Sequence, residues 1–215
     1  MPDAELSPPD APAAEPVETA APARKRPKPG ERRVQILQAL ATMLEQPGAE
    51  RITTAALAAR LEVSEAALYR HFASKAQMFE GLIDFIEQSV FTLVNQITER
   101  EAAGKAQAAK VVAMLLQFAE KNPGMTRVMV GDALVFENER LQQRMNQFFD
   151  KIESTLRQGL RGAAGEEGSA TPSVDAQVRA SMLTSFVVGR LQRFARSGFK
   201  RPPSEYLEAS LASML

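Results

Sequence analysis

The chain of 215 residues contains no cysteine and a single histidine, His71. Without cysteine there is no disulfide, no cysteine-ligated metal and no thiolate nucleophile, and this fits a reducing compartment. A metal site would need partner ligands for His71, and serine-histidine-aspartate catalysis would need His71 itself. We therefore expect no metal, no cofactor and no enzyme activity.

Signals for export or membrane insertion are also missing. Asp3 and Glu5 stand where a secretory signal carries positive charge, and no apolar stretch follows them. The most apolar stretch, 111–119, is interrupted by Gln117 and falls well short of the roughly 20 residues that span a bilayer. We expect a cytoplasmic protein with no membrane association.

Net charge is zero but unevenly distributed, with 26 basic and 26 acidic residues in all. The charged residues of 1–23 are all acidic, and residues 24–78 contain five more basic than acidic residues. In residues 79–215 the numbers of basic and acidic residues are equal. A positive segment beside a neutral one is typical of a chain in which one domain binds phosphate groups and another binds protein.

Residues 1–29 are rich in proline and alanine and lack apolar periodicity. Such a composition offers too little hydrophobic surface to offset the entropy of ordering, so we expect a disordered acidic tail. Its basic end, 24–28, either lies on the DNA backbone or is only solvated.

Residues 30–76 carry the pattern of a tri-helical helix-turn-helix. Apolar residues at three- and four-residue spacing predict a helix over 31–45, which Pro47-Gly48 ends. A short helix over 55–60 follows, and after a tight connection Ser64 caps the next one. Leu68 and Phe72 share the inner face of that helix, so we predict a DNA-binding domain here.

Residues 77–215 are predicted to form a helical dimerisation and partner-binding domain in an all-α fold, because no strand periodicity persists. Helices are expected over 75–100, 106–121, 125–130, 138–160 and 173–196, with a short one after Ser204. The glycines in 162–169 are expected to separate the last two long helices, and Glu166 and Glu167 make them unsuitable as a phosphate loop.

Two long apolar stripes in this segment predict a two-fold four-helix interface, unless packing within one chain uses one of them. The first stripe consists of Leu141, Met145, Phe148, Phe149, Ile152, Leu156 and Leu160. The second consists of Val178, Met182, Leu183, Phe186, Val187, Leu191 and Phe194.

The recognition helix is predicted to expose small and basic side chains. With Leu68 at the centre of the buried face, a step of 100° per residue turns Ala66 and Arg70 outward, flanked by their neighbours. Alanine methyl groups can meet thymine, and an arginine can take a guanine edge or a phosphate. The candidate DNA contacts are Thr53, Thr54, Ser64, Ala66, Ala67, Tyr69, Arg70, His71 and Lys75.

Each of these residues also has a purely structural interpretation. Either Thr53 or Thr54 is the expected N-cap of the second helix, and Thr53 and Ser64 are interpretable as caps and nothing more. Tyr69 can be a packed surface aromatic, and His71 can cover the core with its ring. The convergence of all of them on one motif in a positive segment favours DNA binding.

These residues resemble the TetR family of DNA-binding proteins. The resemblance rests on Ile52-Thr53-Thr54, Val63-Ser64, the run 68–72 and Ser74-Lys75, within about 34–79. Glu62 departs from the family, which has glycine in this turn. If the position needs a positive φ, glutamate costs about 1 kcal/mol there.

Further along, the sequence is similar to the nucleoid occlusion factors of this family, through 64–72, Phe85-Ile86-Glu87, 122–134 and 136–142. That resemblance implies homodimers that bind palindromic sites in double-stranded DNA, assemble further along it and, when DNA-bound, antagonise polymers of the division GTPase FtsZ. It implies a nucleoid location and an FtsZ surface with the candidates Phe85, Met114, Lys121 and Asn122.

Alternatives remain for these positions and for the function. Phe85 and Met114 are also interpretable as core residues, and Asn122 as a residue that shapes a turn. The competing function is a ligand-responsive transcriptional repressor, whose C-terminal helices would enclose a small molecule.

Overall fold

The computed structural model describes residues 30–46 and 51–215, and every regular element in these two ranges is a helix. The all-α prediction is confirmed. The predicted tail, with its basic end, and Pro47-Gly48 lie outside the described residues.

The helices follow the order expected from the sequence. In chain order they are α1 (Glu31–Leu44), α2 (Thr54–Arg60), α3 (Glu65–Tyr69), α4 (Lys75–Arg100), α5 (Gly104–Lys121), α6 (Pro123–Met129), the 3-10 helix η1 (Asp132–Leu134), α7 (Glu139–Glu166), α8 (Pro172–Arg196) and α9 (Leu207–Met214). Most ends agree with the predicted ranges within two residues.

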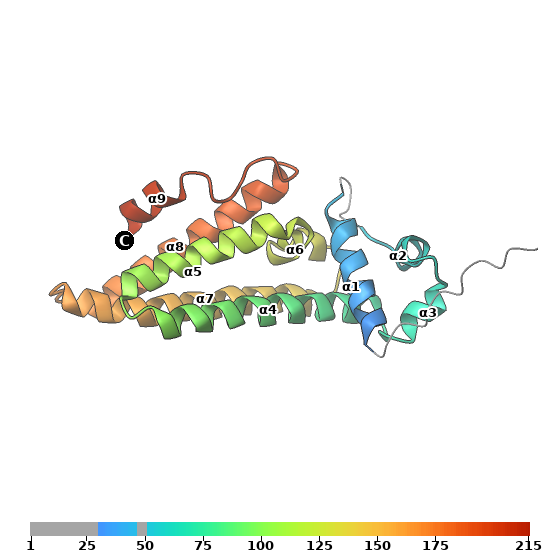
Figure 1. The fold of residues 1–215 in the computed structure, drawn as a ribbon, viewed down its shortest axis with the longest axis horizontal. Coiled ribbons are helices and arrows are strands. Elements are labelled where there is room, and N and C mark those ends of the chain that lie inside the picture. Colours follow the sequence, from blue (N-terminus) through green and yellow to red (C-terminus); the bar gives the residue numbers. More distant parts are fainter. Residues whose placement is uncertain (1–29, 47–50) are drawn as a thin grey trace, which may run out of the picture.

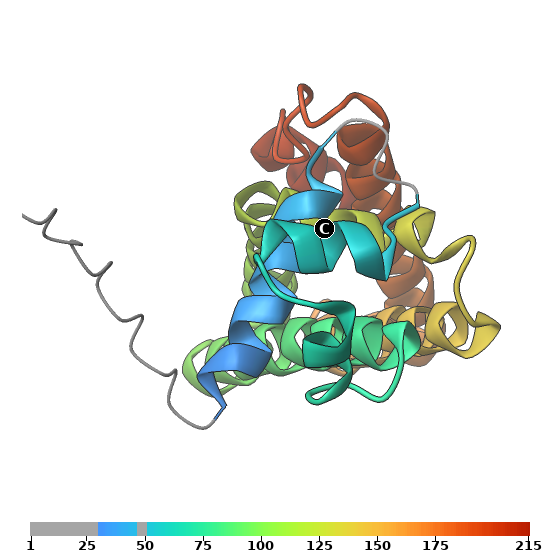
Figure 2. The same ribbon diagram turned by 90° about the vertical axis from the view of Figure 1, so that its right-hand side faces the viewer.

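Four long helices, α4, α5, α7 and α8, run along the long axis of the molecule (Figure 1). Helix α1 crosses one end of this bundle, and α2 and α3 lie beyond it, so that they face the viewer in the end-on view of Figure 2. The helix-turn-helix therefore stands at one end. Within the described ranges, none of the helices has both the length and the hydrophobicity of a membrane-crossing segment.

The C-terminal part of α7 corrects the predicted boundary. The helix continues through Gly162 and Gly165 to Glu166, instead of ending near 160. Glycine in a helix costs only about 1 kcal/mol relative to alanine. Burial of Ala163 and Ala164 offsets that cost, since both lie in contact with the rest of the bundle.

Ion pairs fix the same end of α7. Glu167, the C-cap residue, pairs with Lys105 at the start of α5 and with Arg179 of α8. Hydrogen bonds from Lys105 first, and from Arg179 after it, hold the pKa of the Glu167 carboxyl below its ordinary value. The predicted separation of α7 and α8 is thus reduced to the short connection 167–171.

The DNA-proximal end of the bundle is joined to α1 by a very close approach at α6. Gly124, the second residue of α6, is buried, and a Cβ atom added to it would lie 1.9 Å from the carbonyl oxygen of Ala41 in α1. No side chain fits this contact without moving the backbone of one helix.

The corner between α5 and α6 is held by its own polar side chains. Asn122 Nδ2 donates to the Phe118 carbonyl at 2.7 Å. The buried Thr126 hydroxyl bonds with the Ala119 and Asn122 carbonyls at 2.9 and 3.1 Å. The Ala119 and Asn122 carbonyls also accept the amides of Asn122 and Thr126, so the side chains add to the backbone bonds that hold this corner.

Replacing Gly124 with alanine tests this joint. Because the added methyl group overlaps the Ala41 carbonyl, we expect the free energy of unfolding to fall by about 1 to 3 kcal/mol, measured by urea denaturation. The control is Gly165→Ala in α7, where a Cβ meets nothing within 4 Å and where alanine should stabilise by up to about 1 kcal/mol. Equal stability of the two variants would contradict a tight contact.

Candidate nucleic-acid interface

Both short helices of the helix-turn-helix begin with the predicted caps. Thr53 Oγ1 accepts from the Ala56 amide at 3.1 Å, and Ser64 Oγ accepts from the Ala67 amide at 3.3 Å. A hydroxyl that accepts at a cap still has its own hydrogen to donate. Capping and a phosphate contact are therefore compatible at both positions.

The turn after α2 has a positive φ at Glu62, the position at which the family has glycine. Glu62 has a φ of 53°, its amide bonds to the Ala59 carbonyl at 3.1 Å, and the Val63 amide bonds to the Ala58 carbonyl at 3.0 Å. This pair of bonds is a Schellman motif, whose left-handed position favours glycine. Glutamate here costs about 1 kcal/mol relative to glycine.

The recognition helix shows the predicted inner and outer faces. Leu68 and Phe72 are each 1% exposed, whereas Ala66, Tyr69 and Arg70 are exposed and Ala67 is half-buried. The helix proper ends at Tyr69, with Arg70 still in the helical region. His71 is exposed, and its amide bonds to the Leu68 carbonyl. The outward surface is confirmed, and its contacts with DNA stay a prediction.

Thr54 is arranged differently from Thr53. Its hydroxyl bonds with Glu65 Oε2 at 2.5 Å, which links the first turn of α2 to that of α3. A carboxylate accepts, so the threonine donates its hydrogen here and has none left for a phosphate. In this arrangement Thr54 holds the two helices together.

Lys75, predicted to contact phosphate, forms an ion pair with Glu137 in the segment between η1 and α7. Its Nζ also lies 5.7 Å from the centroid of the Phe79 ring. A DNA phosphate would therefore share this ammonium with a carboxylate, or replace the carboxylate.

Sequence reasoning missed three exposed arginines in this domain, Arg33, Arg51 and Arg60. Their charges contributed to the positive excess of 24–78, but no motif singled them out. Arg33 forms a hydrogen bond with the His71 carbonyl, which lies 38 positions further along the chain and just after the recognition helix.

The candidate partner residues lie on two adjacent helices. Phe85 of α4 is 48% exposed, which contradicts the interpretation of this residue as core. Met114 of α5 is partly buried and packs against the core, Lys121 is exposed, and Asn122 is half-buried. Helices α4 and α5 run side by side (Figure 1), so the fold brings the four positions to neighbouring elements.

The two apolar stripes have different environments. The α7 stripe is used within the chain: apart from the half-buried Phe149, all its members are at most 2% exposed in the core. It therefore packs within one chain, which is the alternative that the sequence left open for one of the two stripes. On α8, Leu183, Val187, Leu191 and Phe194 are buried, whereas Val178 and Met182 are exposed.

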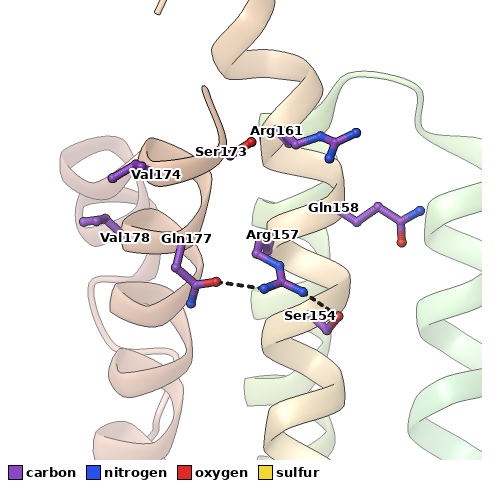
Figure 3. Close-up of a pocket in the computed structure, with 8 residues that line it drawn as sticks. All are labelled: Ser154, Arg157, Gln158, Arg161, Ser173, Val174, Gln177 and Val178. Carbon is purple, nitrogen blue, oxygen red and sulfur yellow. Dashed lines mark hydrogen bonds between the residues drawn. The ribbon is translucent and has the colours of Figure 1, made fainter. Parts of the chain in front are cut away.

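An exposed apolar line remains on α8, formed by Val174, Val178 and Met182 at four-residue spacing. Beside the first two residues a groove of about 680 Å³ runs between α7 and α8 (Figure 3). The α7 side of this groove is polar, with Arg157 bonded to Gln177 at 3.0 Å. Large apolar side chains aligned on one exposed helix face are typical of an interface.

In residues 30–46 and 51–215, no group of three or more histidines and carboxylates is arranged to hold a metal ion.

Comparison with protein families shows two matching regions that together span most of the described chain. Residues 36–82 match the bacterial regulatory proteins of the tetR family. Residues 105–214 match the tetracyclin repressor-like C-terminal domain of the SlmA-like type. The first region contains the helix-turn-helix, and the second contains α5 to α9.

Curated relatives are similar over nearly their whole length. The nucleoid occlusion factor SlmA of Photobacterium profundum is 54% identical over 175 residues, which is 81% of this chain and 89% of that protein. SlmA of Vibrio cholerae is 54% identical over 174 residues, covering 80% and 88%. SlmA of Idiomarina loihiensis is 51% identical over 178 residues, covering 83% and 90%.

Solved structures share the fold at much lower identity. The fatty acid degradation regulator FadR of Bacillus halodurans superposes with a TM-score of 0.69 at 15% identity, covering 86% of this chain and 95% of that one. The TetR family regulator PfmR of Thermus thermophilus gives 0.65 at 21% identity, covering 84% and 97%. These two comparisons concern the arrangement of the helices only.

The Lys75–Glu137 pair provides a test of the phosphate contact. If Lys75 binds phosphate, Lys75→Ala lowers the log–log slope of DNA affinity against salt by about one unit. Glu137→Ala frees the ammonium and should raise the affinity. Both effects are measured by fluorescence anisotropy across a salt series, and an unchanged slope in Lys75→Ala would remove this residue from the interface.

Proposed function

The chain belongs to the TetR family and, within it, to the SlmA nucleoid occlusion factors, and on this premise we propose that it binds palindromic DNA and, when DNA-bound, antagonises FtsZ polymers. The observation that carries the proposal is that the similarity to SlmA covers both the helix-turn-helix and the bundle, at more than half identity. Division would thereby be blocked over the chromosome, which places the protein at the nucleoid.

DNA recognition falls to residues 30–76. The outward face of α3 presents two small residues and one arginine, Ala66, Ala67 and Arg70, which suits close approach to base edges in the major groove. Thr53, Ser64, Tyr69, His71 and Lys75 surround this face, where phosphate contacts set orientation.

We assign homodimerisation to the domain of residues 77–215, through α8 and the groove beside it. Val174, Val178 and Met182 are exposed in one chain, and a second copy related by a two-fold axis would cover them in an isologous contact. The two recognition helices would then lie about 34 Å apart, which is the spacing of half-sites in a palindrome. Dimers bound side by side would extend the assembly along DNA.

We assign FtsZ binding to the faces of α4 and α5 near the DNA-binding end. Phe85 supplies an exposed aromatic side chain, and Lys121 supplies an exposed positive charge at the end of the neighbouring helix. Aromatic and basic side chains together are typical of recognition surfaces for proteins.

The structure gives a ligand-responsive repressor no specific support. Such a protein encloses its ligand among the bundle helices, whereas the hollow of about 520 Å³ between α6, α7 and α8 lies at the surface, because Gln142, Asn146 and Asp150, which line it, are exposed. The groove between α7 and α8 lies on the outside of one chain (Figure 3).

Met182→Glu tests the dimer face. Since Met182 is 47% exposed in one chain, the substitution leaves the core intact but places a charge in the two-fold contact. We expect a monomer in sedimentation velocity and at least tenfold weaker binding to a palindromic duplex. Phe85→Glu, an equally exposed position on α4, is the matched control and should remain dimeric. A dimeric Met182→Glu protein would move the interface elsewhere.

Sedimentation of FtsZ polymers tests the function. With GTP present, we expect the wild-type protein to reduce the pelleted FtsZ when a palindromic duplex is added, and to have little effect without it. Phe85→Glu should bind the duplex with wild-type affinity and leave the polymer in the pellet. Tyr206→Ala, an exposed aromatic in the segment before α9, serves as the control and should behave as wild type.

Two results would contradict the proposal. One is loss of polymer that does not depend on DNA. The other is unchanged pelleting at every DNA concentration that saturates the protein.

A further inference from the structure

One arginine of α1, outside the two helices α2 and α3, reaches the segment that follows the recognition helix. Arg33, in the first turn of α1, donates from Nη1 to the His71 carbonyl at 2.9 Å. Its guanidinium carbon lies 4.1 Å from the centroid of the Phe72 ring. Both partners immediately follow α3, although they are separated from Arg33 by about forty residues of sequence.

The contact acts where the recognition helix most needs support. Helix α3 is only five residues long, and a helix of this length has no stability of its own. The positive charge lies just beyond the C-terminal end of α3, near the negative end of the helix dipole, and it bonds the His71 carbonyl that follows. The planar guanidinium also stacks on the ring that anchors the helix from behind.

The neighbouring Arg32 provides a natural comparison. Its Nη1 bonds with Gln35 Oε1 at 2.9 Å, which is a contact within α1. The two arginines therefore carry the same charge at the same end of the molecule, and within the described residues only Arg33 bonds with the segment that follows the recognition helix.

We propose that Arg33 is a positioning residue for sequence recognition: it holds α3 at the angle at which Ala66 and Arg70 meet base edges. The proposal rests on the DNA recognition proposed above and adds a residue that lies outside α2 and α3. Arg33 thereby contributes to the discrimination between sequences and not to the attraction for the DNA backbone.

This role predicts a particular combination of effects. Arg33→Ala should weaken binding to the specific duplex about tenfold, as expected for loss of a charge-assisted bond. Binding to a scrambled duplex should stay within about twofold, and the salt slope for the specific duplex should be unchanged, because no phosphate contact is lost. Arg33→Lys retains the charge and one donor, and should recover part of the discrimination.

The probe is the duplex that the wild-type protein itself enriches from a randomised library, with a scrambled version as the non-specific DNA. Affinities are measured by fluorescence anisotropy from low to moderate salt, and the unfolding midpoint of each variant is recorded. Arg32→Ala is the control and should keep the wild-type ratio of specific to non-specific affinity.

The outcomes separate this inference from the proposed function. A salt slope lower by about one unit, with both duplexes weakened alike, would show that Arg33 binds phosphate and would overturn the positioning role. An unchanged specificity ratio in Arg33→Ala would overturn it as well. Failure of the wild-type protein to enrich any sequence would instead contradict the proposed function.

Discussion

Burial of Leu68 and Phe72 is the interaction on which the DNA-binding end depends. Helix α3 cannot persist alone, so these two side chains, each 1% exposed, hold it against the remaining helices. Phe72 packs where α1 and α4 meet, since a Cβ on Gly81 would lie 3.1 Å from the Phe72 ring and 3.3 Å from Leu37. The outward face is available for DNA because the inward face is fully used.

A row of ion pairs extends this support along the bundle. Arg140 pairs with Glu80, and Arg144 bonds with Glu87 at 2.5 Å and with Asp84 at 2.6 Å, all between α4 and α7. Glu87 first, and Asp84 with it, raises the pKa of Arg144 above its ordinary value. Single pairs of this kind contribute little to stability, but as a set they fix the register of the two helices.

The sequence predicted what is determined locally. Both ends of α4 were predicted, because Ser74 caps its start and the apolar pattern persists to Arg100. The α7 end was missed because burial of Ala163 and Ala164 depends on other helices. Periodicity showed that the α7 stripe is apolar but not which surface covers it. Arg33 was missed since its partner lies far along the chain.

The contact between Gly124 and Ala41 has a consequence for which DNA sequences can be bound. Because nothing separates α6 from α1 there, neither helix can slide toward the other, and each helix-turn-helix is fixed to its bundle. In the proposed dimer, the distance between the two recognition helices would therefore be fixed. One inserted base pair between half-sites shifts them by about 3.4 Å and turns them by about 35°. A dimer of the proposed kind would not follow that change, so the spacing of the half-sites would become part of its operator code.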